Sequence, residues 1–150
     1  MILPCLRETN IFPHSQTQFY DMKPKIIKIL THQKDGDILS VIENIVDFKR
    51  LFFINVVEAK IRGNHAHVKC TQYLFSIRGH IEVEVTNSID TYKYELKCGI
   101  NILKIPPLWW AKQNYSSDST LGVLCDMNYD EDDYIRDWDK FVEAVKNEKN

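Results

Sequence analysis

Two histidines separated by one residue are the feature of this sequence that most directly indicates chemistry. His65 and His67 lie in the run RGNHAH, residues 62–67, and side chains two apart on an extended strand point to the same face. Neutral imidazole, with an ordinary pKa of about 6.5, accepts and donates protons at physiological pH. Two such groups side by side can remove a proton next to a carbonyl and return it. The pair therefore predicts acid–base chemistry, and two solvent-facing surface histidines are the simpler alternative.

The residues that follow the pair have the spacing of a known motif. Gln72 comes five residues after His67, and Gly79 comes seven residues after Gln72. This order is similar to the first cupin motif, G…H-x-H-x(3,4)-E-x(6)-G. The stretch from Gly99 to the run PPLWWA, residues 106–111, resembles the second cupin motif, G…P-x-G-x-x-H. The sequence thus resembles a cupin at both motifs.

The two motifs differ from those of metal-binding cupins at the ligand positions. Gln72 stands where those proteins have a glutamate, and Ala111 stands where they have a third histidine. Two imidazoles and a neutral amide are a poor ligand set for Fe(II), Mn(II) or Zn(II), which prefer a carboxylate or a further imidazole. We therefore predict no metal and no other cofactor, which makes a metal-dependent dioxygenase the least favoured function.

Several further motifs resemble one family of cupins, the dTDP-sugar 3,4-ketoisomerases of bacterial deoxysugar biosynthesis. The matching segments are RGNHAH (62–67), Gln72, Gly79, IPPLWW (105–110), SSD (116–118) and YDEDDYIRDWDKF (129–141). They occur in compatible order from about Gly36 to Phe141 and so cover most of the chain. The RG-x-HAH run and the YDE-x-DYIRD ending together are far more specific than two spaced histidines.

The resemblance implies a fold, an assembly and a reaction. The fold is all-β, a cupin with a jelly-roll-like antiparallel β-barrel, in a homodimer that often exchanges N-terminal strands. The reaction converts dTDP-4-keto-6-deoxyglucose to a dTDP-3-keto-6-deoxyhexose through an enediol, in the synthesis of surface glycans such as the O-antigen of lipopolysaccharide. By position, His65 and His67 are the catalytic pair, with His67 expected to be the main base and His65 its partner.

Two other functions stay open at this point. A dTDP-sugar 3,5-epimerase would use related histidine chemistry on the same substrate, although the short chain and the RG-x-HAH run favour the isomerase. A non-catalytic cupin that only binds a nucleotide sugar is the alternative outside enzymes, and the presence of both histidines argues against it. The configuration of the product at carbon 4, galacto or gluco, is left open.

A nucleotide diphosphate needs cations and polar groups around it. Arg62 comes three residues before His65 and is expected to reach the pyrophosphate, while Gln72 is expected to bond a sugar hydroxyl. Further candidates for substrate binding are Lys69, Arg78, Lys104 and Trp110. For the three cations among them a solvated surface position is an equally good interpretation. Tyr129, Tyr134 and Trp138 are expected to hold the C-terminal helix on the barrel rather than to touch substrate.

A framework of short strands must position these side chains. From Pro24 onward, β-like runs alternate with turn clusters, and His80–Thr86 alternates cleanly between apolar and charged residues. The expected strands are 25–30, 38–43, 50–57, 65–77, 80–86, 91–97, 102–105 and 120–127. About eight strands at this spacing predict a sandwich or barrel.

The two ends of the chain differ from this pattern. Residues 1–23 show no period and are interpreted as an N-terminal arm, which leaves 24–150 as a single domain. Residues 130–147 carry apolar side chains at spacings of three and four behind an acidic first turn. This pattern predicts an amphipathic helix whose apolar stripe packs on the outside of the sheet.

Composition sets the outer limits of function. The chain has 150 residues, of which 44% are hydrophobic, and a net charge of −2. This charge gives no bulk attraction to nucleic acid, and no apolar run approaches the roughly 20 residues of a membrane span. The four cysteines, at positions 5, 70, 98 and 125, form no C-x-x-C pair. We therefore predict a soluble cytoplasmic protein whose partner is a small nucleotide sugar.

Overall fold

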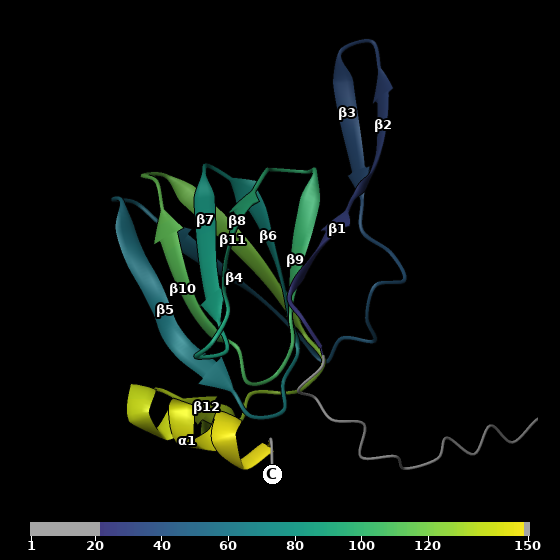
Figure 1. The fold of residues 1–150 in the computed structure, drawn as a ribbon. Helices are drawn as coiled ribbons and strands as arrows, with labels where there is room; N and C mark the ends of the chain where they lie inside the picture. Colours follow the sequence, from purple (N-terminus) through teal and green to yellow (C-terminus); the bar gives the residue numbers. More distant parts are fainter. Residues whose placement is uncertain (1–21, 149–150) are drawn as a thin grey trace, which may run out of the picture.

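The computed structural model describes residues 22–148, which form two five-stranded sheets, a separate hairpin and a C-terminal helix (Figure 1). The strands are β1 (Lys25–Lys28), β2 (Leu30–Lys34), β3 (Asp37–Val41), β4 (Arg50–Val56), β5 (Lys60–His67), β6 (Gln72–Arg78), β7 (Ile81–Thr86), β8 (Thr91–Leu96), β9 (Asn101–Ile105), β10 (Trp110–Tyr115), β11 (Ser119–Cys125) and β12 (Tyr134–Ile135). A 3₁₀ turn (Glu131–Asp133) precedes β12, and α1 (Trp138–Glu148) ends the described chain.

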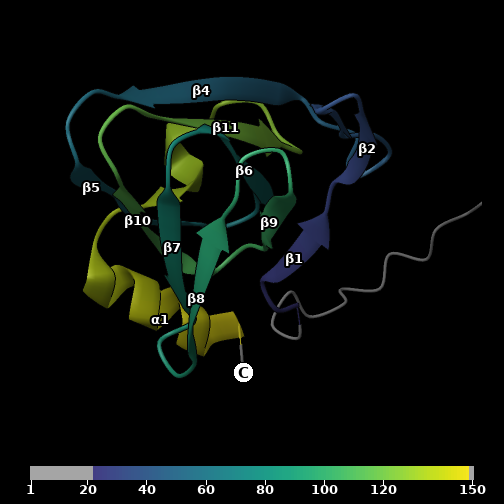
Figure 2. The same ribbon diagram turned by 90° about the horizontal axis from the view of Figure 1, so that it is seen from above.

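The two sheets enclose one apolar interior. One sheet has the order β1-β9-β6-β11-β4 and the other the order β12-β5-β10-β7-β8, with antiparallel neighbours throughout. Seen from above, they curve around a common centre (Figure 2). Alternate residues point inward, as β7 illustrates, where Ile81, Val83 and Val85 are fully buried between partly exposed neighbours. The predicted all-β, jelly-roll-like barrel is confirmed.

Several strands differ from those that the sequence predicted. The single expected run 65–77 is two strands, because aspartate side chains accept hydrogen bonds from the backbone N–H groups between β5 and β6. Asp133 accepts hydrogen bonds from the backbone N–H groups of Lys69 and Cys70, and Asp126 accepts one from Thr71. Strand β10, which carries inward-facing Gln113, was not among the expected runs.

The C-terminal helix is shorter than predicted, since α1 begins at Trp138 rather than at residue 130. The Asp130 side chain accepts from the Asp132 N–H and so caps the 3₁₀ turn, and β12 then pairs with His67 and Ala66 of β5. The acidic residues assigned to a helical first turn therefore belong to a segment that extends the sheet. The apolar face of α1 packs on the outer side of β5, as expected, where Phe141 is completely buried.

The β2–β3 hairpin stands away from the barrel (Figure 1). Its two-residue turn, Asp35-Gly36, has φ angles of 53° and 91°, which suit a hairpin turn that requires positive φ at both central positions. Leu30, Ile38 and Leu39 are more than half exposed on it. These apolar side chains have no cover within the described part of one chain.

The predicted N-terminal arm, residues 1–23, lies outside the described residues except for its last two. At the start of the described chain, the Met22 carbonyl accepts a hydrogen bond from Trp109 Nε1 at 3.0 Å, and the Pro24 carbonyl accepts one from the Tyr94 hydroxyl at 3.0 Å. These bonds attach the segment to the barrel. Over residues 22–148, no helix has the length and apolar character needed to cross a membrane.

Candidate active site

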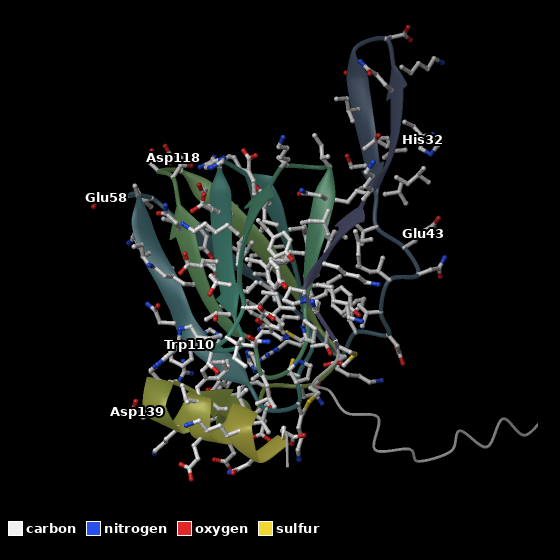
Figure 3. The ribbon with its side chains drawn as sticks, in the orientation of Figure 1. His32, Glu43, Glu58, Trp110, Asp118 and Asp139 are labelled. Carbon is white, nitrogen blue, oxygen red and sulfur yellow. The ribbon has the colours of Figure 1, made fainter. Side chains whose placement is uncertain are left out.

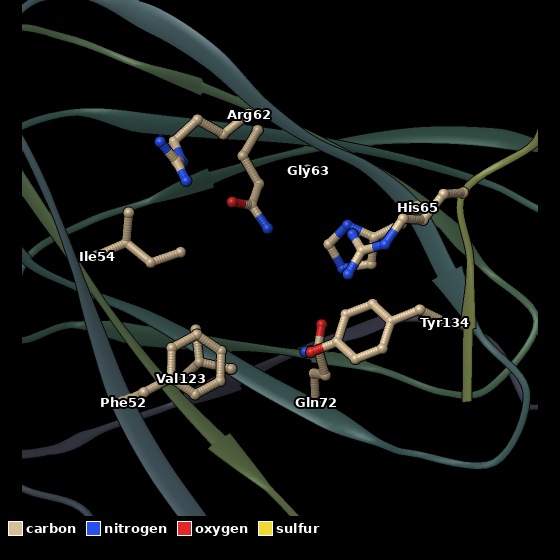
Figure 4. A pocket seen from close by; sticks show the side chains of 10 residues that line it. Phe52, Ile54, Arg62, Gly63, His65, Gln72, Val123 and Tyr134 are labelled. Carbon is tan, nitrogen blue, oxygen red and sulfur yellow. The ribbon is translucent and has the colours of Figure 1, made fainter. Parts of the chain in front are cut away.

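A cavity of about 220 Å³ opens between the two sheets (Figure 4). Strands β5, β6 and β10, together with β12 and the residue that follows it, supply the polar part of its lining. The lining residues are Phe52, Ile54, Arg62, Gly63, His65, Gln72, Gln113, Val123, Tyr134 and Arg136. Two cations, one imidazole, two amides and one phenol thus meet in a space fit for a small polar ligand.

A β-bulge brings Arg62 into the cavity beside His65. On a regular strand Arg62 and His65 would face opposite sides, because they are three residues apart. Here Ala111 pairs with His65 and Lys112 pairs with Gly63, so Asn64 has no partner in the register. Gly63 has a φ of 84°, and a Cβ built on it would lie 2.8 Å from the Ala111 carbonyl oxygen. Glycine is therefore required here. Gly63 thus forms part of a bulge within β5.

His65 is the histidine of the pair that lines the cavity. Burial, followed by the nearby His67, lowers the pKa of His65 to about 4. The imidazole is therefore neutral at pH 7 and carries a free lone pair on one nitrogen. A neutral imidazole in a cavity can accept a proton from a bound ligand.

His67 lies behind His65, with its ring in an edge-on arrangement 5.2 Å away between centroids. Its Nδ1 is 2.8 Å from Asp133 Oδ2, and its Nε2 is buried with no hydrogen-bond partner among the described residues. Burial lowers the pKa of His67 from its ordinary value despite the neighbouring carboxylate. His65 therefore has direct access to the cavity. His67, which was expected to be the main base, lies behind His65 and is not part of the cavity lining.

Tyr134 lines the cavity, although it was expected to hold the helix rather than to touch substrate. Its ring lies 4.3 Å from that of His67 and 5.2 Å from that of His65, and its hydroxyl points across the cavity toward Gln72 (Figure 4). Arg136, two residues later, stacks its guanidinium 4.4 Å from the Tyr134 ring.

Arg136 is held in place by an ion pair with Glu131, whose Oε1 and Oε2 accept from Nε and Nη2 at 3.0 and 3.2 Å. The Tyr129 hydroxyl also donates to Glu131. All of these residues belong to the YDEDDYIRD motif, which carried the family resemblance but was interpreted as helix. The motif was therefore a signal for site residues that the sequence interpretation assigned to structure.

Of the predicted binding residues, Arg62 and Gln72 line the cavity and four others lie outside its lining. Arg78 bonds the carbonyl and carboxylate of Asp118 at the end of the barrel far from α1 (Figure 3). Lys104 stacks on Tyr73 on the outer face of its sheet. Trp110 packs against Trp138 and Phe141.

Lys69, the fourth of these residues, contributes its backbone N–H to Asp133. Trp138, as expected, holds α1 on the barrel through Trp110. The structure therefore brings Arg62, Gln72 and the histidine pair together, adds Arg136 and Tyr134, and leaves the other four candidates at the rim, in the loop or on the outer faces.

Two buried thiols, Cys70 and Cys125, lie next to Gln72, which contacts Cys125. Cys125 Sγ accepts from Gln72 Nε2 at 3.9 Å and from Arg50 Nη2 at 3.4 Å. The hydrogen bond from Cys70, together with Arg50, lowers the pKa of Cys125, while the same bond and burial raise that of Cys70. Arg50 in turn stacks on the rings of Phe52 and Tyr129. Gln72 therefore contacts, through its Nε2, the same sulfur that Arg50 contacts.

Three described side chains are close enough to share a metal ion: His67, Cys70 and Asp133, whose ligand atoms lie within 4.8 Å of one another. The contacts of these three side chains fit a hydrogen-bonded cluster better than a metal site. Asp133 Oδ1 accepts from Lys69 N at 2.7 Å, and Oδ2 accepts from His67 and from Cys70 N. A thiol with a raised pKa is also a weak ligand, because metals bind the thiolate.

Comparison with known proteins places this geometry among sugar isomerases. Residues 22–146 match the family model FdtA, described as WxcM-like, C-terminal. The chain is 30% identical over 115 residues to a TDP-4-oxo-6-deoxy-alpha-D-glucose-3,4-oxoisomerase from Aneurinibacillus thermoaerophilus, covering 73% of this chain and 83% of that one.

Solved structures agree with this relationship. A 3,4-ketoisomerase from Helicobacter canadensis superimposes with a TM-score of 0.78 at 27% identity, covering 83% of this chain and 98% of that one. The sugar 3,4-ketoisomerase QdtA from Thermoanaerobacterium thermosaccharolyticum, in complex with TDP, gives 0.76 at 28% identity, covering 83% and 95%.

Proposed function

Because this chain belongs to the WxcM-like, C-terminal (FdtA) family, we propose that it is a sugar 3,4-ketoisomerase acting on TDP-4-keto-6-deoxyglucose. The relative from Aneurinibacillus thermoaerophilus carries that activity in its name, and QdtA binds TDP. The product is a TDP-3-keto-6-deoxyhexose. The observation that carries the proposal is the neutral, cavity-lining His65 with a second imidazole directly behind it.

The reaction needs two proton movements, and the site offers two imidazoles. In the substrate, carbon 3 bears a hydrogen and a hydroxyl, and carbon 4 is a carbonyl. Isomerisation moves one proton from carbon 3 to carbon 4 and one from oxygen 3 to oxygen 4, through an enediol in which carbons 3 and 4 are joined by a double bond. No electron leaves the sugar, so atoms and charge balance without an external oxidant or reductant.

We assign the carbon proton to His65 because it lines the cavity. The neutral ring takes the proton from carbon 3 as the enediol forms, and the resulting imidazolium returns a proton to carbon 4. His67 assists the transfer between the oxygens, and the Tyr134 ring packs 4.3 Å from its own. A single positioned base typically contributes about 10²–10⁴-fold to the rate.

Charge complementarity supports a nucleotide-linked sugar as the ligand. Arg62 and Arg136 both line the cavity, and guanidinium groups bind diphosphate oxygens in a bidentate manner. Gln72 and Gln113 present amides to the same space and are suited to sugar hydroxyls. Arg136 is already ion-paired with Glu131, so Arg62 supplies the net positive charge of the cavity in a chain whose net charge is −2.

We propose that the protein acts as a homodimer. The β2–β3 hairpin exposes Leu30 and Leu39, and the edge strand β4 exposes Leu51 and Phe53. Exposed apolar groups of this number indicate an interaction surface, and a second copy of the chain offers matching apolar groups.

The proposed activity is tested by incubating the purified protein with TDP-4-keto-6-deoxyglucose in deuterated buffer and following the sugar by NMR. We expect a 3-keto product with deuterium at carbon 4 and unchanged configuration at carbon 5. Exchange or inversion at carbon 5 would indicate a 3,5-epimerase instead. Binding without turnover would indicate a nucleotide-sugar-binding protein. Turnover should survive a chelator, and loss that Fe(II) restores would contradict the metal-free mechanism.

A further inference from the structure

Asp133 is a buried carboxylate that the proposed reaction has not used so far. Its side chain is 5% exposed, and that of His67 is 6% exposed. Three N–H groups point at it: the backbone N–H of Lys69 at 2.7 Å, that of Cys70 at 3.3 Å, and His67 Nδ1 at 2.8 Å. The 3₁₀ turn carries Asp133 to this position, and β12 then pairs with β5 at His67 itself.

The geometry determines which nitrogen of His67 carries its proton. An ionised carboxylate has no hydrogen to donate, so the short contact to Asp133 requires a proton on Nδ1. In a neutral imidazole the other nitrogen, Nε2, is then an acceptor with a free lone pair. Nε2 is buried and has no partner among residues 22–148, so the chain leaves this lone pair unused.

From this arrangement we infer that Asp133 is a positioning residue that holds His67 in the Nδ1–H form and keeps Nε2 available to accept a proton. The inference rests on the proposed function for its kinetic consequence, because only a proton-transfer reaction requires that lone pair. It adds Asp133 to the residues of the C-terminal segment that belong to the site, which already include Tyr134 and Arg136. Asp133 acts through His67 and does not itself line the cavity.

The tautomer can be measured without substrate. The full chain labelled with ¹⁵N-histidine gives long-range ¹H–¹⁵N spectra that distinguish a protonated from an unprotonated ring nitrogen, and His67→Gln assigns the His67 signals. We expect wild-type His67 to be protonated on Nδ1 and unprotonated on Nε2 at pH 7. Protonation on Nε2 in the wild type would overturn the inference, and this outcome depends on no variant.

Asp133→Asn tests the kinetic consequence. The amide can turn its N–H₂ group toward Nδ1, which forces the proton of His67 onto Nε2. We expect kcat to fall by about 10²–10⁴-fold, as a wrong tautomer does in other Asp–His pairs, while KM changes less than threefold. A kcat within threefold of the wild type would contradict the inference.

Asp126→Asn is the matched control, because Asp126 accepts a backbone N–H from Thr71 in the same loop but touches neither histidine. It should leave kcat and the His67 tautomer unchanged. Asp133→Glu, which keeps the carboxylate, should retain the Nδ1–H form and recover part of kcat, whereas a merely structural Asp133 would not separate the two variants. If the wild type shows the Nδ1–H form but does not turn over the sugar, the proposed function fails and the Asp133–His67 arrangement stands.

Discussion

At the scale of single residues, the roles proposed for the two histidines predict which proton transfer each variant would impair. His65 lines the cavity and His67 lies behind it, so removal of the carbon proton should depend on His65. His65→Asn is expected to lower turnover by at least about 10²-fold and to abolish deuterium exchange at carbon 3. His67→Asn should lower net turnover but still allow that exchange. NMR of the sugar in deuterated buffer measures both quantities.

The opposite pattern would assign the main base to His67, as the sequence alone suggested. Binding of TDP by calorimetry is the control, since both variants should keep affinity within a few-fold of the wild type.

The burial of His65 also determines how activity depends on pH. Its pKa is lowered to about 4, first by burial and then by His67, with Arg136 acting in the same direction. Because the neutral ring is the proposed base, kcat/KM should be flat between pH 6 and 8 and fall about tenfold per pH unit below pH 4. An acid limb near the ordinary histidine pKa of about 6.5 would contradict a buried base. Arg136→Gln should move the limb to higher pH.

At the scale of elements, the bulge in β5 is what brings a cation and a base into one cavity. Gly63→Ala adds a Cβ at a φ of 84° and 2.8 Å from the Ala111 carbonyl. We expect a loss of roughly 1–3 kcal/mol in the free energy of unfolding, measured by urea denaturation, and a lower kcat/KM because Arg62 and His65 shift relative to each other.

Gly36→Ala is the control for backbone strain alone. Gly36 has a φ of 91°, and a Cβ there meets nothing within 4 Å. This variant should be destabilised less than Gly63→Ala and should keep its activity. Equal losses of stability and activity in the two variants would show that the close contact with Ala111 has no effect.

The sequence predicted most clearly the strand in which residue type follows burial. Strand β7 was clear because apolar and charged residues alternate along it. Strand β10 was missed because the polar Gln113 points inward, where it accepts a hydrogen bond from the buried Tyr115 hydroxyl.

The same limit applies to the site. His65, Arg62 and Gln72 were predictable from motif spacing, whereas Asp133 was not, because an aspartate in an acidic run is ordinarily exposed. Its burial depends on contacts with Lys69, Cys70 and His67, far away in the sequence. No local pattern encodes such contacts.

At the scale of the whole molecule, the neutral histidine affects stability as well as activity. The unfolded chain binds a proton at His65 near pH 6.5, whereas the folded chain binds it only near pH 4. Between these values the unfolded state holds more protons, so stability falls as the pH falls from 6.5 to 4. The difference corresponds to about 3 kcal/mol.

His65→Gln should remove much of this acid sensitivity, since glutamine does not titrate. Urea denaturation at pH 7 and at pH 4.5 measures the difference for both proteins. An unchanged pH dependence in the variant would mean that other groups cause the loss of stability in acid.

The exposed hairpin connects the fold to the proposed dimer. In the register of β2 and β3, Leu30 lies opposite Val41 and Leu39 opposite His32, so Leu30, Leu39 and Val41 share one face. Leu30 is 52% and Leu39 is 61% exposed, which would be unfavourable in an isolated chain.

Leu39→Asp should therefore convert the dimer to monomer at micromolar concentration in sedimentation velocity. Thr31→Asp places the same charge on the opposite face of the hairpin and should leave the dimer intact. Wild-type protein that sediments as a monomer throughout, or equal behaviour of the two variants, would show that this face does not hold two copies together.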